Sequence, residues 1–217
     1  HIQDDWGRVF HIDREGDGVP MQGPVNEPGD LKRLKIIHPQ EGEFLMLMTS
    51  IRSLGKDVAH ALFVTGPFRE SWSMMGGMEN LFYYYKKDPQ FVKDLSRIVT
   101  DYILEVIDKG AAMGADAIAL SSDLAYDHST LMSPRQYEEY IFPYHVEIVK
   151  HIHDKGMKCI KHSDGVMWPL MDYMVAAGFD GLHPPLQPKP GDVLGCARER
   201  ARVLVGGDDM LGASLGQ

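Results

Sequence analysis

The stretch "GADAIALSSDLAYDHSTLMSPRQYEEYIFPYHVEIVKHIHDKGMKCIKHSDG", residues 114–165, decides the fold class. Its two ends, "GADAIALSSD" and "MKCIKHSD", are short runs with apolar interiors, which is typical of buried strands. Between them, Ser133 with Gln136 three residues later forms a capping-box pattern, and Gly156 is a stop signal. The stretch therefore predicts a strand, a helix over 133–155 and a second strand, which together make one unit of a parallel sheet.

The same alternation continues along most of the chain. Strands are predicted over 60–66, 114–123, 157–164, 180–184 and 202–209, and further helices over 44–54, from Asp88-Pro89 onward, over 167–177 and near 192–200. The strands are apolar throughout rather than alternating, which predicts that both faces of the sheet are covered. Five such α/β units fit an open doubly wound sheet or an incomplete (β/α)8 TIM barrel, which has eight strands when complete.

The chain divides into two regions. Residues 1–43 are polar and rich in Gly and Pro, and they predict a loop and hairpin extension packed on the barrel, with strands near residues 8–12 and a short helix at "EPGDLKRL". Residues 44–217 carry the partial barrel. The chain begins at His1 without a signal-peptide pattern and ends just after a strand-like run, so we interpret it as a fragment of a longer protein.

The composition excludes several classes of protein. Of 217 residues 44% are hydrophobic, and the net charge of −9 comes with dispersed cations, which argues against a nucleic-acid partner. No run of about 18 apolar residues is present to span a membrane. Cys159 and Cys196 lie far apart and outside any CxxC pattern, which favours a reducing, cytoplasmic location over a disulfide framework.

Polar residues follow the predicted strands where each of them ends. They are Thr65 and Gly66, Ser121, Ser122 and Asp123, His162 and Asp164, His183, and Asp208 and Asp209. In a parallel barrel these ends meet at one opening, where active sites lie, and this favours the barrel over the open sheet. His162 and Asp164 are two residues apart and point to the same side of their strand, which suits a shared contact with a metal or a polar substrate. His183 is a candidate third ligand.

Each of these residues also has a purely structural interpretation that the sequence leaves open. His162 can be a hydrogen-bonded histidine at a strand end, and His183 can be fixed by the two prolines that follow it. Asp123 either caps the following loop or takes part in chemistry. Ser122 beside Asp123 could position a hydroxyl-bearing or cationic substrate, and Tyr126 either reaches the opening or is simply exposed.

The order of the motifs resembles that of the uroporphyrinogen decarboxylase superfamily. The resemblance rests on "DDWGRVF" (4–10), "TGPFRESWSMMGGMENLFYYYKKDPQFVKDL" (65–95), the stretch 114–165 and "GFDGLHPPLQPKPGDVLGCARERARVLVGGDD" (178–209). Its most specific part is the "LMSPRQY…IFPYH" helix followed by "KHSDG". The resemblance implies a (β/α)8 barrel with one of two activities. These are cofactor-free decarboxylation of uroporphyrinogen III in porphyrin synthesis, and zinc-dependent methyl transfer to or from corrinoid proteins.

Within this superfamily, the methyltransferases that activate coenzyme M carry a His-x-Cys pair at the matching strand end, with a later Cys, as zinc ligands. Here His162 is kept and Asp164 stands at the cysteine position. A carboxylate oxygen is a harder ligand than a thiolate, but zinc accepts it. The departure argues against activation of coenzyme M. The remaining possibility in this branch is a related methyltransferase that moves a methyl group between a small methoxylated or methylamine-type substrate and a corrinoid protein partner. The "DDWG" and "KHSDG" motifs favour this methyltransferase branch.

The resemblance and the strand ends together give the expected site. Catalytic roles are expected for Asp123, His162 and Asp164, zinc ligation for His162 and Asp164, and substrate binding for Arg69, Ser122, Tyr126, His183 and Asp208. Decarboxylation of uroporphyrinogen is the alternative, although its eight carboxylates call for several arginines and only Arg69 is expected near a strand end. A third hypothesis is a non-catalytic barrel that binds a small ligand.

Overall fold

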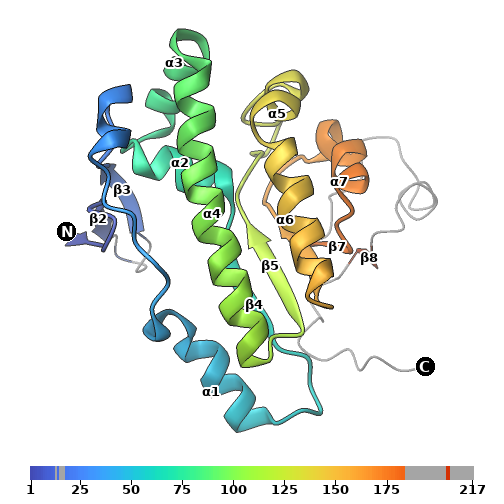
Figure 1. Cartoon of the computed structure of the whole chain (residues 1–217). Coiled ribbons are helices and arrows are strands. Elements are labelled where there is room, and N and C mark those ends of the chain that lie inside the picture. The colour runs from blue at the N-terminus through green and yellow to red at the C-terminus, as the bar shows by residue number, and fades with distance from the viewer. Residues whose placement is uncertain (13, 15–17, 184–203, 206–217) are drawn as a thin grey trace.

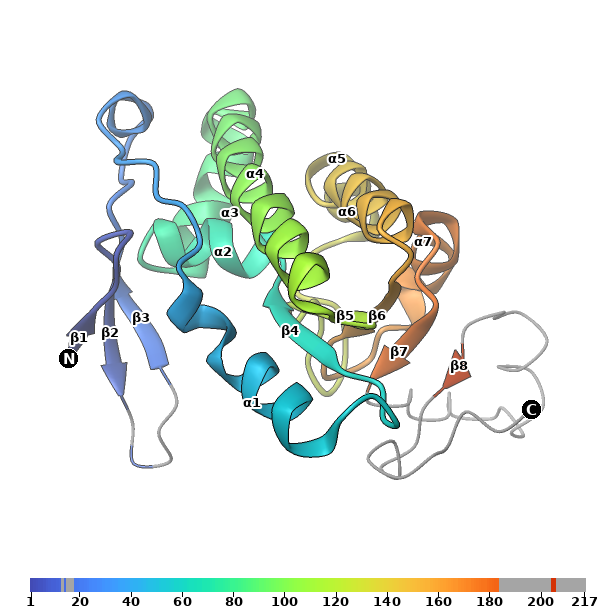
Figure 2. The same cartoon turned by 60° about the horizontal axis from the view of Figure 1, so that its bottom comes forward.

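The computed structural model describes residues 1–12, 14, 18–183 and 204–205. Its centre is a parallel sheet whose strands follow one another in chain order: β4 (Ala61–Thr65), β5 (Ala117–Ser121), β6 (Lys158–His162), β7 (Gly181–His183) and β8 (Leu204–Val205). Among the described residues the helices lie on one side of this sheet (Figures 1 and 2). A doubly wound sheet reverses its strand order and carries helices on both faces, so this arrangement is that of a (β/α) barrel. The expected helix near 192–200 lies outside the described residues.

In the described part of the chain, six α-helices accompany the strands of the parallel sheet. They are α2 (Pro67–Met74), α3 (Met78–Lys87), α4 (Pro89–Met113), α5 (Pro134–Tyr140), α6 (Phe142–Asp154) and α7 (Met171–Ala177), the last preceded by the 3-10 turn η3 (Trp168–Leu170). The predicted start of α4 is confirmed, because the Asp88 side chain accepts the Phe91 N–H at 3.1 Å. Figure 1 shows α3 and α5 near the C-terminal ends of the strands.

The prediction of one continuous helix over 133–155 is wrong. The capping box of Ser133 and Gln136 forms as expected, but α5 ends at Tyr140 and α6 begins at Phe142. Pro143, in the first turn of α6, lacks an N–H, and its ring would collide with the carbonyl four residues earlier in a continuous helix.

The expectation that both faces of every strand are covered is also wrong at β4. Leu62 and Val64 are buried against the helices, whereas Phe63 between them is 61% exposed on the other face. In a closed barrel that face turns inward, where side chains from the other strands cover it. The strands present here form part of such a wall, so the inner surface at β4 is open to solvent.

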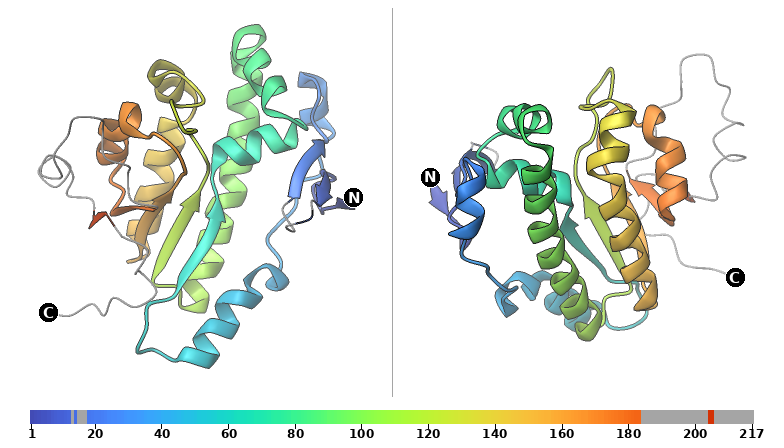
Figure 3. Two further views of the ribbon diagram at one scale, coloured as in Figure 1. Left: turned by 180° about the vertical axis from the view of Figure 1, so that it is seen from behind. Right: turned by 45° about the horizontal axis from the view of Figure 1, so that its top comes forward.

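The N-terminal region forms an antiparallel sheet of its own, which confirms the predicted hairpin. Its elements are β1 (Ile2–Gln3), β2 (Val9–Ile12) and β3 (Gly18–Gln22), followed by η1 (Pro28–Lys32), η2 (Glu41–Phe44) and α1 (Leu45–Leu54). It lies beside α2 (Figure 3), where the Val25 N–H donates to the Met74 carbonyl at 3.0 Å. The division at residue 43 stays a prediction.

None of the described helices is long and apolar enough to cross a membrane.

His145 on α6 makes the stability of the fold depend on pH. Its ring is fully buried, with Nδ1 2.7 Å from the Tyr137 hydroxyl, and burial, aided by the charge of Lys161, holds its pKa well below 6.5. Below pH 6.5 the unfolded chain takes up a proton at this position and the folded chain does not. The free energy of unfolding should therefore fall by about 1.4 kcal/mol per pH unit as the pH drops below 6.5.

Urea titrations between pH 5 and 7 measure this dependence. In the His145→Phe variant, we expect the free energy of unfolding to change less steeply with pH than in the unchanged protein. Any loss of stability from the substitution that does not depend on pH leaves this slope unaffected. His11→Ala, at an exposed position on β2, is the control and should keep the original slope. Equal slopes in the His145 variant and the unchanged protein would contradict the prediction.

Candidate metal centre

The register of the parallel sheet brings the ends of four strands to the same level. Thr65 pairs with Ser121, Ser121 with His162, and His162 with His183. This confirms that the strands run side by side in one direction, so that their last residues and the loops after them share one edge. The predicted site residues on β5, β6 and β7 therefore lie close together.

Three side chains at this edge form a cluster suited to a cation. Asp123 follows β5, His162 ends β6 and Asp164 lies two residues further on, and one ligand atom of each falls within 4.8 Å of the others. Asp123 and His162 are half-buried and Asp164 is exposed, so the cluster opens to solvent. The Asp164 N–H donates to Asp123 Oδ1 at 3.1 Å. This hydrogen bond fixes the Asp123 carboxylate relative to the backbone of Asp164. Two carboxylates and an imidazole are ligands that zinc accepts, so these residues fit the metal that the sequence suggests.

His183, the candidate third ligand, contacts His162 rather than completing the cluster. The two Nδ1 atoms are 2.9 Å apart and the rings are stacked, with centroids 5.2 Å apart. One Nδ1 must carry a hydrogen and the other must accept it, because two lone pairs would repel at this distance. Burial lowers the pKa of His162, against the opposing effect of Asp164 and Asp123. The neutral imidazole that results is the form that binds metals.

The loop after β6 is fixed against the loop after β5. The buried Ser163 hydroxyl accepts the Leu124 N–H at 2.9 Å, and the Ser163 N–H donates to the His183 carbonyl at 3.0 Å. Gly165 has φ +84°, and a Cβ there would lie 2.6 Å from the backbone nitrogen of Tyr126. Only glycine allows the backbone at position 165 to come this close to Tyr126, and this close approach positions Asp164, the residue before it.

The other predicted site residues occupy different surroundings. Ser122 is fully buried, and its hydroxyl has no hydrogen-bond partner among the described residues, whereas Tyr126 is 50% exposed, with its ring edge-on to that of His128. The Arg69 guanidinium lies on α2, 5.4 Å from the centre of the Trp72 ring. Their roles in substrate binding stay predictions, and Asp208 lies outside the described residues.

Cys159, three residues before His162, does not extend the cluster. It is fully buried, and it pairs in register with Ile118, whose side chain is also fully buried. Burial raises the pKa of its thiol far above the usual range, which disfavours the thiolate form that binds zinc. Among the described residues, the donor set at this edge is therefore nitrogen and oxygen.

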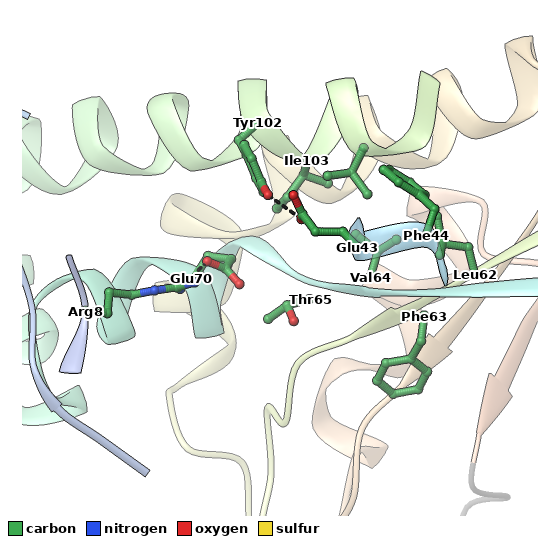
Figure 4. A pocket seen from close by; sticks show the side chains of 11 residues that line it. Arg8, Glu43, Phe44, Leu62, Phe63, Val64, Thr65, Glu70, Tyr102 and Ile103 are labelled. Carbon is green, nitrogen blue, oxygen red and sulfur yellow. Dashed lines mark hydrogen bonds and ion pairs between the residues drawn. The ribbon is translucent and has the colours of Figure 1, made fainter. Parts of the chain in front are cut away.

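A separate hollow of about 240 Å³ runs along β4, and each charged side chain that lines it has a hydrogen-bond partner (Figure 4). Arg8, from the "DDWGR" segment, contacts Glu70 at 2.5 Å and also binds Asp4 and Ser73. The Tyr102 hydroxyl donates to Glu43 at 2.6 Å. This network is not among the predictions from the sequence, although the charged residues of "DDWGR" were the signal that could have revealed it.

Comparison with known proteins agrees with this geometry. Residues 9–194 match the family model described as uroporphyrinogen decarboxylase (URO-D). The chain belongs to the uroporphyrinogen decarboxylase family. The family fold is a TIM barrel, and the consecutive parallel strands seen here are part of one. No curated protein matches the sequence significantly.

Among solved structures, a methyltransferase from Methanosarcina mazei is similar to this uroporphyrinogen decarboxylase family chain. The TM-score is 0.66 and the identity 18%, over 82% of this chain and 52% of the other. At this identity the likeness establishes the shared fold. The chain spans about half the length of that methyltransferase.

Proposed function

We propose that this protein is a metal-assisted methyltransferase, which moves a methyl group between a small methylated substrate and a corrinoid protein. The observation that carries the proposal is the cluster of Asp123, His162 and Asp164 at the C-terminal edge of the sheet. Membership of the family and the fold of the Methanosarcina methyltransferase support it. Zinc or a similar cation would be held by these three side chains.

The donor set favours a methoxylated or methylamine-type substrate over a thiol. A bound zinc ion would supply Lewis-acid polarisation of the substrate heteroatom. His183 holds the His162 ring through the Nδ1 contact, and the Asp164 N–H holds the Asp123 carboxylate. In this reaction the electron pair of the broken methyl–heteroatom bond would stay on the heteroatom, which would then take a proton. A reduced corrinoid, held by the partner protein, would supply the electron pair for the new bond to the methyl carbon.

Metal analysis of the full-length protein tests the proposal. We expect about one zinc per chain, with an affinity that falls by more than about 100-fold in His162→Ala and in Asp123→Asn, because each removes one of three protein ligands. Methyl transfer from a methoxylated donor to a corrinoid protein should fall in parallel.

His38→Ala provides the matched control, since His38 is an exposed histidine paired with Glu105 and lies outside the cluster. It should leave zinc content and methyl transfer unchanged. An unmodified protein without zinc, together with full activity in His162→Ala, would remove the proposed role of the cluster.

Decarboxylation of uroporphyrinogen is the second candidate, because the matching family model carries that description. The groups at the strand ends argue against it, since Asp123 and Asp164 would repel a substrate that bears eight carboxylates. An assay for coproporphyrinogen formation distinguishes the two activities, and we expect no product.

A further inference from the structure

Lys161 is a buried lysine beside the metal cluster that the proposed chemistry does not use, and burial lowers the pKa of its side chain to about 7. It lies in register with Leu120, whose side chain is buried on the helix side of the sheet, and has no exposed surface itself. In the part of the chain that the structure describes, its ammonium makes no ion pair within 4.0 Å. Instead, Nζ donates to the carbonyls of Leu120, Ser122 and His162 at 3.4, 2.7 and 2.5 Å. All three belong to the adjacent ends of β5 and β6.

These contacts lie where the ladder between β5 and β6 stops. The Ser122 N–H still donates to the His162 carbonyl at 3.2 Å. If the parallel ladder continued, the Ser122 carbonyl would accept the Asp164 N–H. The Asp164 N–H instead donates to Asp123 Oδ1, and the Lys161 ammonium supplies a donor to the Ser122 carbonyl. The lysine therefore takes the place of a backbone donor at the point where the two strands part.

We propose that Lys161 is a positioning residue of the metal centre, which ties the ends of β5 and β6 together and frees the Asp164 N–H to fix Asp123. This inference rests on the proposed function in one respect, that the cluster binds a metal. Lys161 is not a catalytic residue, because its ammonium is buried among backbone carbonyls and does not reach the solvent-facing side of the cluster. Its effect on the metal passes through the placement of Asp123, His162 and Asp164.

The test compares Lys161→Met with Lys158→Met in the full-length protein. Methionine is unbranched and nearly as long as lysine, so it replaces the apolar stem and removes the hydrogen-bond donors. Lys158, on the same strand, has an exposed ammonium that pairs with Asp180, so its variant controls for loss of a positive charge on β6. Zinc affinity is measured by competition with a chromophoric chelator, and the visible spectrum of the cobalt(II)-substituted protein reports the geometry of the ligands.

We expect Lys161→Met to bind zinc about 10- to 100-fold more weakly, the range seen when groups that orient metal ligands are removed. Its cobalt spectrum should shift, and Lys158→Met should match the unchanged protein in both measurements. Should Lys161→Met fail to fold, Lys161→Gln, which keeps two amide donors, replaces it in the comparison. Its zinc affinity is expected to lie between that of the unchanged protein and the roughly 10- to 100-fold weaker affinity expected for Lys161→Met.

The outcomes separate this inference from the proposed function. Normal affinity and an unshifted cobalt spectrum in a folded Lys161 variant would overturn the positioning role and leave the metal site standing. Absence of metal binding in the unchanged protein would instead overturn the proposed function, and the positioning role with it. A weaker affinity with a shifted spectrum supports both.

Discussion

Gly165→Ala is expected to destabilise the protein by about 3 kcal/mol and to abolish metal binding at the cluster. Two costs add. Alanine at φ +84° is strained by roughly 1–2 kcal/mol, and forcing its Cβ into the backbone of residues 125 and 126 adds roughly 1–3 kcal/mol. The loop can relieve the collision only by moving away from the β5 loop, and Asp164 next to it moves too. Denaturant unfolding and zinc titration measure the two effects.

Gly156→Ala is the matched control for this change. Gly156 has φ +77°, but no atom lies within 4 Å of the position its Cβ would take. Gly156→Ala should lose only the roughly 1–2 kcal/mol of stability that the strain of a positive φ costs, and it should keep full zinc affinity. If the two variants lost equal stability and both still bound zinc, the close approach of Gly165 to the β5 loop would not be what places Asp164.

Arg8→Met is expected to cost about 3–5 kcal/mol at neutral pH, because it leaves a buried carboxylate without its cation. Arg8 and Glu70 join the N-terminal sheet to α2, with side chains only 14% and 12% exposed. Burial raises the pKa of Glu70, and Arg8 is the main group that opposes this shift. Without Arg8 the folded protein holds a proton on Glu70 more strongly than the unfolded chain does. The loss measured by urea unfolding should therefore shrink as the pH falls.

The double variant Arg8→Met/Glu70→Gln separates the effect of the unpaired Glu70 charge from the loss of the Arg8 side chain. Replacing the carboxylate with a neutral amide removes the unpaired charge, so the double variant should be more stable than Arg8→Met alone. Arg33→Met, which breaks an exposed pair with Asp30, is the control and should cost no more than about 1 kcal/mol. A double variant that is less stable than Arg8→Met would show that the guanidinium acts through packing rather than through its charge.

Local sequence patterns are sufficient to predict the alternation of strands and helices, the parallel class of the sheet and the strand ends that carry polar residues. These features follow from local patterns, such as the apolar run of residues 117–120 and the Ser133 capping box. Two local patterns give wrong predictions. The pattern over 133–155 predicts one helix although Pro143 interrupts it, and the apolar run of β4 predicts cover on both faces although Phe63 is exposed.

Only the tertiary structure decided which residues meet. The sequence paired His162 with Asp164 and offered His183 as a third ligand, whereas the fold brings Asp123 into the cluster and turns His183 toward the His162 ring. Arg8 and Glu70 are 62 residues apart in the chain, and Lys161 resembles any polar residue in a short strand until its ammonium is seen among three carbonyls. The physical reason is that a local pattern sets the direction of a side chain within its own strand. Strand register and the packing of loops, which involve distant residues, set the distance between side chains on different strands.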